Sequence, residues 1–76
     1  MAWEWVYQSN PPRWVLTVGE WHAVVQRGAG KDYGWIPWVE RTTAPLNRYD
    51  GPKSNDPMTA RAWCLTKIAE LRTARP

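Results

Sequence analysis

The chain lacks phenylalanine, has one cysteine and one histidine, and contains no long apolar run. A single cysteine excludes an internal disulfide and a cysteine-based metal site, and is typical of a reducing compartment. The N-terminal segment MAWEWVYQSNPP has no basic stretch followed by an apolar one, so it does not resemble a signal peptide. No segment approaches the roughly 20 apolar residues of a membrane span, so we expect a cytoplasmic protein without membrane contact.

Residues that carry catalysis are also scarce. Ser9 and Ser54 lie in predicted loops, without the pattern of a nucleophile elbow. His22 and Cys64 would form a dyad only if a strand and a helix aligned them, and a sheet-surface imidazole with a packed thiol is the simpler interpretation. The carboxylates show no paired spacing, and the glycine-rich segment GAGKDYG lacks the P-loop pattern. We therefore expect no enzyme activity, no metal ion and no cofactor.

Tryptophan, by contrast, is abundant, with 7 in a chain of 76 residues. A chain of this length makes one domain, 1–76, and each large aromatic side chain buries roughly 150–250 Å² of surface. Part of the tryptophan content is therefore explained by the need to build a core from few residues. Seven are still more than so small a core encloses, and we expect some at its rim or on the surface.

Alternating side chains predict the strands of the sheet. Residues 3–7, WEWVY, have a strand period and indicate an N-terminal strand. WVLTV, residues 14–18, and WHAVVQR, residues 21–27, flank Gly19-Glu20, which predicts a hairpin with a type II′ turn. The core-facing residues of this hairpin are expected to be Trp14, Leu16, Val18, Trp21, Ala23 and Val25.

Residues 35–41, WIPWVER, predict a further strand. Pro37 cannot donate a hydrogen bond to a neighbouring strand, so we expect this strand to lie at an edge or to carry a bulge. Trp35 and Trp38 are three positions apart, and in an extended strand such residues point to opposite faces. Only one of them can enter the core.

A long loop, residues 42–56, precedes the predicted helix at 57–73. Asp56 is the expected N-cap and Pro57 the first helical residue. A stripe of Met58, Ala62, Leu65, Ile68 and Ala69 is the expected core face, with Trp63 off that stripe at the rim. The fold class is thus α+β: a three- to four-stranded antiparallel sheet, within 14–41 plus the N-terminal strand, packed by one C-terminal helix.

The chain carries a net charge of +3, with basic residues at predicted strand ends, in loops and along the helix. The segments GEWHAVVQR (19–27), PWVERT (37–42) and TARAWCLTKIAEL (59–71) resemble DNA-binding domains of AP2 type and of integrase arm-binding type, over about two-thirds of the chain. The resemblance implies that the sheet face opposite the helix enters the major groove of DNA. The residues that would face DNA are Arg13, Val15, Thr17, His22, Val24, Gln26, Ile36, Trp38 and Glu40.

Nucleic-acid binding, most simply to DNA, is therefore the leading expectation. The simpler alternative is that the Lys and Arg side chains only keep the surface of a small domain hydrated and bind nothing. The candidate binding residues are Arg13, His22, Gln26, Arg27, Lys31, Trp38, Arg41, Arg48 and Trp63. The family face is rich in arginine, whereas here Val15, Val24 and Ile36 are apolar and Glu40 would repel phosphate. A protein partner is the alternative, with this chain as a small inhibitor or adaptor of phage or mobile-element type, or as a subunit of a homodimer. Its contacts would be Trp3, Trp5, Trp38, Trp63 and Tyr49.

Overall fold

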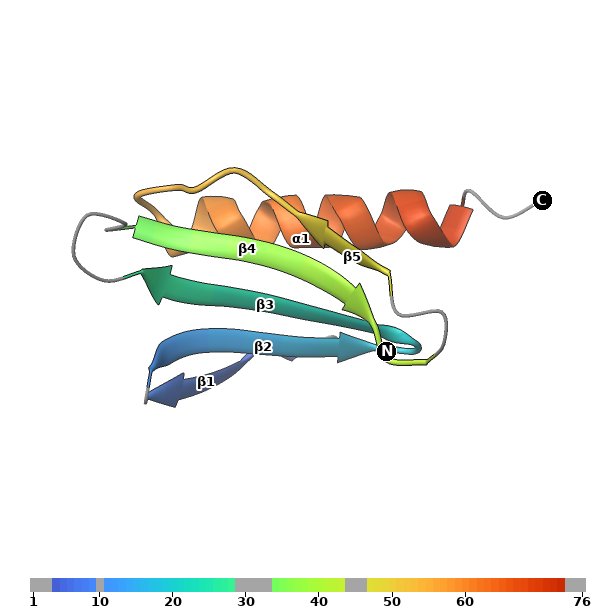
Figure 1. Ribbon diagram of the computed structural model, residues 1–76, viewed down its shortest axis with the longest axis horizontal. Helices are drawn as coiled ribbons and strands as arrows, with labels where there is room; N and C mark the ends of the chain where they lie inside the picture. The colour runs from blue at the N-terminus through green and yellow to red at the C-terminus, as the bar shows by residue number, and fades with distance from the viewer. Residues whose placement is uncertain (1–3, 10, 29–33, 44–46, 74–76) are drawn as a thin grey trace.

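The computed structural model describes residues 4–9, 11–28, 34–43 and 47–73. It is a five-stranded antiparallel sheet with strand order β1-β2-β3-β4-β5, covered on one face by a single helix, α1 (Figure 1). The elements are β1 (Val6–Ser9), β2 (Pro12–Val18), β3 (Trp21–Gly28), β4 (Gly34–Arg41), β5 (Arg48–Asp50) and α1 (Pro57–Thr73). The α+β class with one C-terminal helix is confirmed, and the sheet has five strands where three to four were expected.

The turn between β2 and β3 has the predicted form. Gly19 has φ +58°, and Val18 pairs with Trp21 across the turn. In the described part of the chain, only glycines have a positive φ, so Glu20 does not. A positive φ at the first central position alone is the signature of a type II′ turn. This turn fixes the register of β2 and β3, and with it the side chains that share each face.

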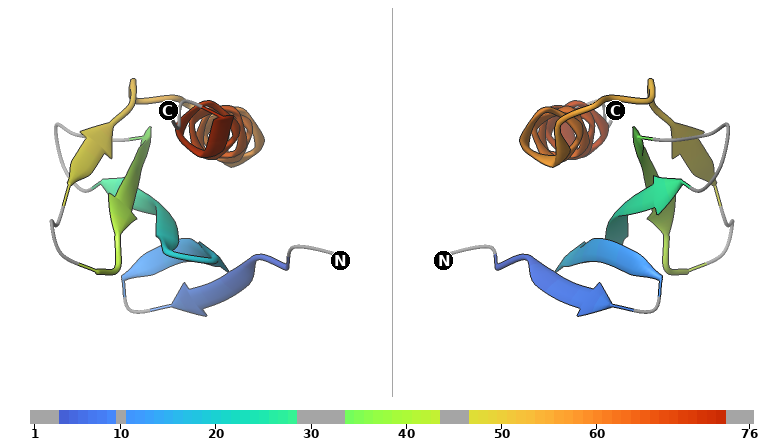
Figure 2. Two further views of the ribbon diagram at one scale, coloured as in Figure 1. Left: turned by 90° about the vertical axis from the view of Figure 1, so that its right-hand side faces the viewer. Right: turned by 90° about the vertical axis from the view of Figure 1, so that its left-hand side faces the viewer.

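The core lies between α1 and the face of the sheet that we call the inner face. Leu16, Ala23 and Val39 are aligned across β2, β3 and β4 by the strand register, and all three are buried. The helix packs on β3 and β4, and the twisted sheet bends toward the helix (Figure 2). The predicted core side of the hairpin is confirmed.

The tryptophans divide between the two faces. Trp21 is buried, whereas Trp14 and Trp35 are half-buried and pack against the core from its rim. Trp38 lies on the opposite face, which we call the outer face, because it pairs with Val24 while its neighbour Val39 pairs with the core residue Ala23. The prediction that Trp35 and Trp38 point to opposite faces is therefore confirmed.

Pro37 does not mark an edge strand, so that part of the expectation is wrong, but the pairing beside it is irregular: Trp38 pairs with Asp50 and Trp35 with Ser54, so residues 36–37 lie opposite the three residues 51–53. β4 lies between β3 and β5, and its pairing with β3 runs without interruption through Val25 and Pro37. The carbonyl of Pro37 accepts a hydrogen bond of 2.9 Å from the amide of Gly51. Nitrogen and oxygen of one strand residue point to the same side, so the nitrogen of Pro37 faces residues 51–53, where no strand pairs with β4. A proline is tolerated there because no donor is needed.

Two segments differ from the predicted boundaries. The N-terminal strand is displaced: it starts at Val6, not at residue 3, and ends at Ser9. The expected loop 42–56 contains β5 and a bridge between Trp35 and Ser54, whose amides and carbonyls bond each other at 2.7 and 2.9 Å. This segment returns along β4 because unpaired backbone groups at a sheet edge find partners there. Trp3 and the 29–33 connection lie outside the described residues.

The helix begins as predicted but buries a different face. The Asp56 carboxylate accepts hydrogen bonds from the Met58 amide at 3.1 Å and the Thr59 hydroxyl at 3.2 Å, which confirms the N-cap. The buried helical residues are Ala60, Cys64 and Ile68, whereas Met58 is 60% exposed. The predicted stripe is thus rotated by roughly a third of a turn. The buried stripe combines the small residues Ala60 and Cys64 with Ile68, which is among the largest fully buried side chains together with Val25 and Val39 of the sheet.

Candidate nucleic-acid interface

The outer face carries the residues that were expected to meet DNA. The strand register places three rows across it: Gln8, Arg13, Gln26 and Ile36; Val6, Val15, Val24, Trp38 and Asp50; Thr17, His22, Glu40 and Arg48. Every residue of the predicted DNA-facing set lies here, so their placement on one face is confirmed. The middle row is apolar over most of its length and the rows beside it are mainly polar.

The Trp38 side of this face carries no excess positive charge. Arg48 lies over the Trp38 ring at 4.5 Å and pairs with Asp50 at 2.9 Å. The Trp38 indole N–H donates to the Glu40 carboxylate at 2.8 Å. Arg48 and the Trp38 N–H are therefore already bound by the carboxylates of Asp50 and Glu40. A phosphate that approached them would be repelled by these two carboxylates. This part of the outer face is a poor surface for nucleic acid.

Arg13 and Gln26 lie at the other side of the same face. They pair directly across β2 and β3, and Ile36 is the next residue in their row. The Arg13 Nε donates to the Gln8 side-chain oxygen at 2.7 Å, a contact that orders the arginine without neutralising it. His22, which sits at the opposite end of β3, lies 3.3 Å from the Thr17 hydroxyl through its Nδ1. Arg13 and Gln26 are thus the pair that is placed to contact a polar ligand.

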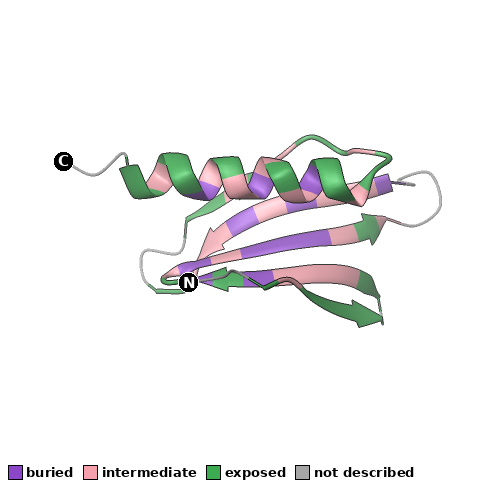
Figure 3. Ribbon diagram, turned by 180° about the vertical axis from the view of Figure 1, so that it is seen from behind, coloured by how far each residue is buried: buried purple, intermediate pink, exposed green. Residues whose placement is uncertain are grey.

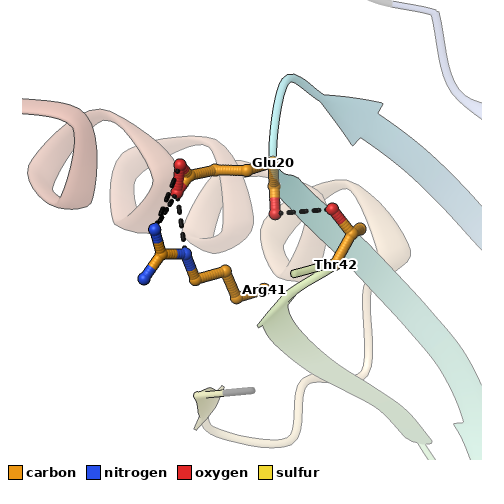
Figure 4. A network of polar contacts seen from close by, with 3 residues as sticks. All are labelled: Glu20, Arg41 and Thr42. Atoms are coloured by element: carbon orange, nitrogen blue, oxygen red, sulfur yellow. Dashed lines mark hydrogen bonds and ion pairs between the residues drawn. The ribbon is translucent and has the colours of Figure 1, made fainter. Parts of the chain in front are cut away.

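Ion pairs collect at the end of the sheet that contains the β2–β3 turn. Arg41 pairs with Glu20 at 2.7 Å, and the Thr42 hydroxyl donates to the Glu20 carbonyl at 3.1 Å (Figure 4). The Arg41 guanidinium also lies over the Trp21 ring at 5.9 Å. With Arg48 and Asp50, these residues form what we call the ion-pair end. Arg41 holds β4 to the turn, and the structure does not place it with Arg13 and Gln26.

At the end of the sheet opposite the β2–β3 turn, arginine side chains lie over tryptophan rings. The Arg61 guanidinium, from the first turns of α1, lies over Trp14 at 4.7 Å and over Trp5 at 5.7 Å. Arg27 pairs with Trp35 across β3 and β4, and its guanidinium lies 5.9 Å from that ring. We call Arg13, Arg27, Lys53 and Arg61 the cation end.

Lys53 joins this group through the segment after β5. Its side-chain carbons lie against Gly34, where a Cβ would approach them to 2.9 Å, and Gly34 has φ +136°. Glycine is required here both by the backbone angle and by the close approach. The exposed lysine is consequently held next to the start of β4, one residue from the Trp35–Ser54 bridge.

Acidic residues are nearly absent from the cation end in the part of the chain that the structure describes. Asp56 is the exception, and both its carboxylate oxygens are used in capping α1. The helix N-terminus, with its partial positive charge, lies at this end as well (Figure 1). Charge is therefore segregated along the length of the molecule, with cations at one end and ion pairs at the other.

The remaining predicted residues separate from these groups. Trp63 is half-buried on α1 and packs over Gly51, so its ring serves the core and not a surface. Lys31 lies outside the described residues. Lys53 and Arg61 were not among the candidates, because no local pattern distinguishes a lysine in a loop or an arginine on a helix from a solvating charge. Only the contacts with Gly34 and with the Trp5 and Trp14 rings place them.

The scarce catalytic residue types do not form a site in the described ranges. His22 lies on the outer face and Cys64 is buried under the inner face, so the sheet separates the two members of the hypothetical dyad. Burial raises the pKa of the Cys64 thiol to about 12, only partly offset by its hydrogen bond to the Trp38 carbonyl. Among described residues, no group of three His, Cys, Asp or Glu is arranged to hold a metal ion, and no helix is long and apolar enough to span a membrane.

Comparison with known proteins identifies no relative: no family model, no curated protein and no solved structure matches this chain.

Proposed function

We propose that this protein is a small, non-enzymatic DNA-binding module that contacts DNA with the cation end of its sheet. The observation that carries the proposal is the segregation of charge: Arg13, Arg27, Lys53 and Arg61 lie at one end, and the ion pairs lie at the other. Nucleic acid is bound mainly through contacts between its phosphates and basic side chains, and a group of basic side chains with few acidic neighbours among the described residues favours such contacts. The proposed DNA-facing surface is thus one end of the molecule, with Arg13 on the outer face, Arg27 beside Trp35 on the inner face and Arg61 on α1.

The cation–ring contacts prepare two arginines for phosphate. A guanidinium in contact with an aromatic ring can still use its N–H groups to form paired hydrogen bonds to phosphate oxygens. Arg61, 4.7 Å from the Trp14 ring and 5.7 Å from the Trp5 ring, and Arg27, 5.9 Å from the Trp35 ring, make such contacts. Holding the side chain in place reduces the rotamer entropy that is lost when the ligand binds.

Arg13 and Gln26 are the candidates for contact with bases. They are adjacent on the outer face at the same end as the cations. Arginine recognises guanine and glutamine recognises adenine through paired hydrogen bonds in the major groove, which a two-stranded ribbon can enter. Arg27 lies on the inner face and Arg61 on α1, so at the end of the sheet they and Lys53 would contact phosphates while Arg13 and Gln26 on the outer face contact bases.

The proposal is tested by fluorescence anisotropy with labelled duplex and single-stranded DNA. Three phosphate contacts predict an affinity for duplex that falls about 40-fold between roughly 50 and 200 mM salt, because each contact contributes a slope of about −0.9. Removing one contact with Lys53→Gln or Arg27→Gln should reduce this ratio to about 12-fold. No duplex binding at the lower salt concentration would contradict the proposal.

Arg48→Gln is the matched control. It removes the same charge from an exposed arginine, but at the ion-pair end, where Arg48 is paired with Asp50. We expect it to leave the salt dependence unchanged. If it weakens binding as much as Lys53→Gln does, DNA is attracted by net charge alone and the cation end has no special role.

A protein partner is the second candidate function, favoured by the apolar row Val15, Val24 and Trp38 on the outer face. A half-buried tryptophan beside apolar residues, with polar rows around it, has the composition of a protein interface. Such a complex would tolerate salt and would weaken with Trp38→Ala. If Trp38→Ala weakens binding of a protein partner but leaves binding of duplex DNA unchanged, the protein and the DNA are bound by different surfaces.

A further inference from the structure

The outer edge of β1 is a sheet edge with unusual properties. β1 is the first strand in the sheet order, and in the described part of the chain nothing pairs with its outer edge (Figure 1). Its residues, VYQS, include no charged side chain and no proline, and all of them are exposed (Figure 3). Proteins commonly protect exposed edges with lysine, proline or bulges, because an unprotected edge pairs with another strand. β1 has none of these protections.

The apolar row of the outer face runs to this edge. It passes from Trp38 through Val24 and Val15 to Val6. Val24 is only 4% exposed, whereas Val6, the last residue in the row, is 56% exposed. The row therefore ends in an uncovered apolar side chain beside unpaired backbone groups, and a strand added at this edge would cover both.

We propose that the occupant is a second copy of this chain, paired antiparallel along β1 with a two-fold axis at Val6. In this register Val6 faces Val6 of the second copy, so the two apolar rows join into one. Glu4 and Trp5 precede β1, and in the dimer they extend the strand, so that Tyr7 faces Trp5 of the second copy on the inner face and Gln8 faces Glu4 on the outer face. Like residues thus meet like residues, and cross-strand apolar and aromatic pairs are stabilising contacts in antiparallel sheets.

The neighbouring register is less favourable. A two-fold axis at Tyr7 would place Val6 opposite Gln8 twice, so an apolar side chain would face a polar one in both pairs. It would also break the continuity of the apolar row. The residues around Val6, from Glu4 to Gln8, are self-complementary only for an axis at Val6.

Electrostatics is compatible with the pairing. Each copy has a net charge of +3, which would oppose association if the cation ends met. Antiparallel strands point the two copies in opposite directions, so the cation ends of the dimer lie far apart at opposite ends of a continuous sheet. β1 itself carries no charge, the paired segment adds only Glu4, and the aromatic side chain of Tyr7, 49% exposed, is available on the inner face.

The first test is sedimentation velocity of the full chain without nucleic acid, from about 5 to 500 µM and at high salt. We expect a concentration-dependent dimer, and Val6→Lys should weaken it at least about tenfold, because the two introduced charges would face each other. Thr17→Lys is the control, since Thr17 is an exposed outer-face residue away from the β1 edge, and it should leave the dimer intact. A monomer at every concentration overturns the proposal.

The second test reports on the register. Val6→Cys should form a disulfide-linked dimer under mild oxidation, because directly opposed residues of antiparallel strands have Cα atoms about 4.5–5.5 Å apart. In the same register the Gln8 positions of two copies are roughly 14 Å apart, so Gln8→Cys should not cross-link. The native Cys64 is buried and does not compete. Equal cross-linking of both variants, or none with Val6→Cys, rejects the axis at Val6.

These tests separate the dimer from DNA binding. The β1 edge and the cation end share no residue, so Val6→Lys should disrupt the dimer while Lys53→Gln leaves it unchanged. A monomeric Val6→Lys variant that binds DNA with the salt dependence predicted above would confirm that the two surfaces act independently.

Discussion

Gly51→Ala tests how α1 packs on the sheet. Gly51 follows β5, donates its amide to the Pro37 carbonyl and lies under the Trp63 ring. A Cβ at this position would come within 2.6 Å of Trp63 Cδ2 and 2.7 Å of Cε2 and Cε3. Carbon atoms normally approach to about 3.5–4.0 Å, so the ring would have to retreat by roughly 1 Å. Trp63 is a rigid ring that also packs against the core, and this limits its retreat.

Two opposing effects set the magnitude. Overpacking of this kind destabilises a protein by about 1–3 kcal/mol. The φ angle of Gly51 is not positive, so alanine fits its backbone and restricts the unfolded chain, which stabilises by about 0.4–1 kcal/mol. We expect Gly51→Ala to lower the free energy of unfolding by about 1.3 kcal/mol, the difference between the central values of these two contributions, about 2 and about 0.7 kcal/mol.

Urea unfolding in a double-mutant cycle separates the two effects. In a Trp63→Leu background the steric conflict is removed, so Gly51→Ala should change sign and stabilise the protein by about 0.4–1 kcal/mol. Trp63→Leu is itself destabilising, and all four proteins are therefore measured in the same concentration of sucrose, which favours the compact state.

Gly19→Ala is the control for this cycle. Gly19 has φ +58° and nothing within 4 Å of a Cβ, so its substitution strains the backbone without meeting Trp63. The loss, about 1–2 kcal/mol, should be the same in both backgrounds. The packing shown here would be refuted if Gly51→Ala had equal effects with and without the Trp63 ring.

Two further substitutions address the cysteine and the helix start. The pKa of Cys64 is raised from 9.0 to about 12 by burial, so the thiol stabilises the fold below pH 9, and this contribution is lost as the pH rises from 9 toward 12. The urea midpoint should fall more steeply between pH 8 and 10 in the wild type than in Cys64→Ala, and a thiol reagent at pH 8 should modify Cys64 only after unfolding. Asp56→Ala should lower the free energy of unfolding by about 1 kcal/mol through loss of the N-cap, whereas Asp56→Asn should retain most of it; equal losses in the two variants would contradict the capping role.

Local patterns were sufficient for much of the fold. The positive φ at Gly19, the opposite faces of Trp35 and Trp38, and the Asp56 cap each depend on a few neighbouring residues. Each could be predicted because turn chemistry, strand alternation and capping act within one element. The set of residues on the outer face followed from the same alternation once the strands were assigned.

The candidate site was predicted only in part. Of the proposed site, Arg13, Gln26 and Arg27 were predicted, whereas Lys53 and Arg61 were not; the predicted residues Arg48 and Arg41 pair with Asp50 and Glu20 at the other end of the sheet. Glu20 and Arg41 are distant in the sequence, and the strand register brings them together. Charge segregation along the molecule is a property of this register and is not visible in the net charge.

The sequence by itself determined the class of fold, the hairpin with its turn, the helix limits and the residues that alternate on each strand, because these depend on interactions between near neighbours. The tertiary structure decided which face of α1 is buried. It also decided that Pro37 is tolerated in β4 although β4 is an inner strand. Apolar residues lie on more than one face of the helix, so its rotation was set by the fit of Ala60, Cys64 and Ile68 against the inner face of the sheet, where Val25 and Val39 are fully buried. Pro37 is accepted because the strand beside it is interrupted where its missing donor would have been used.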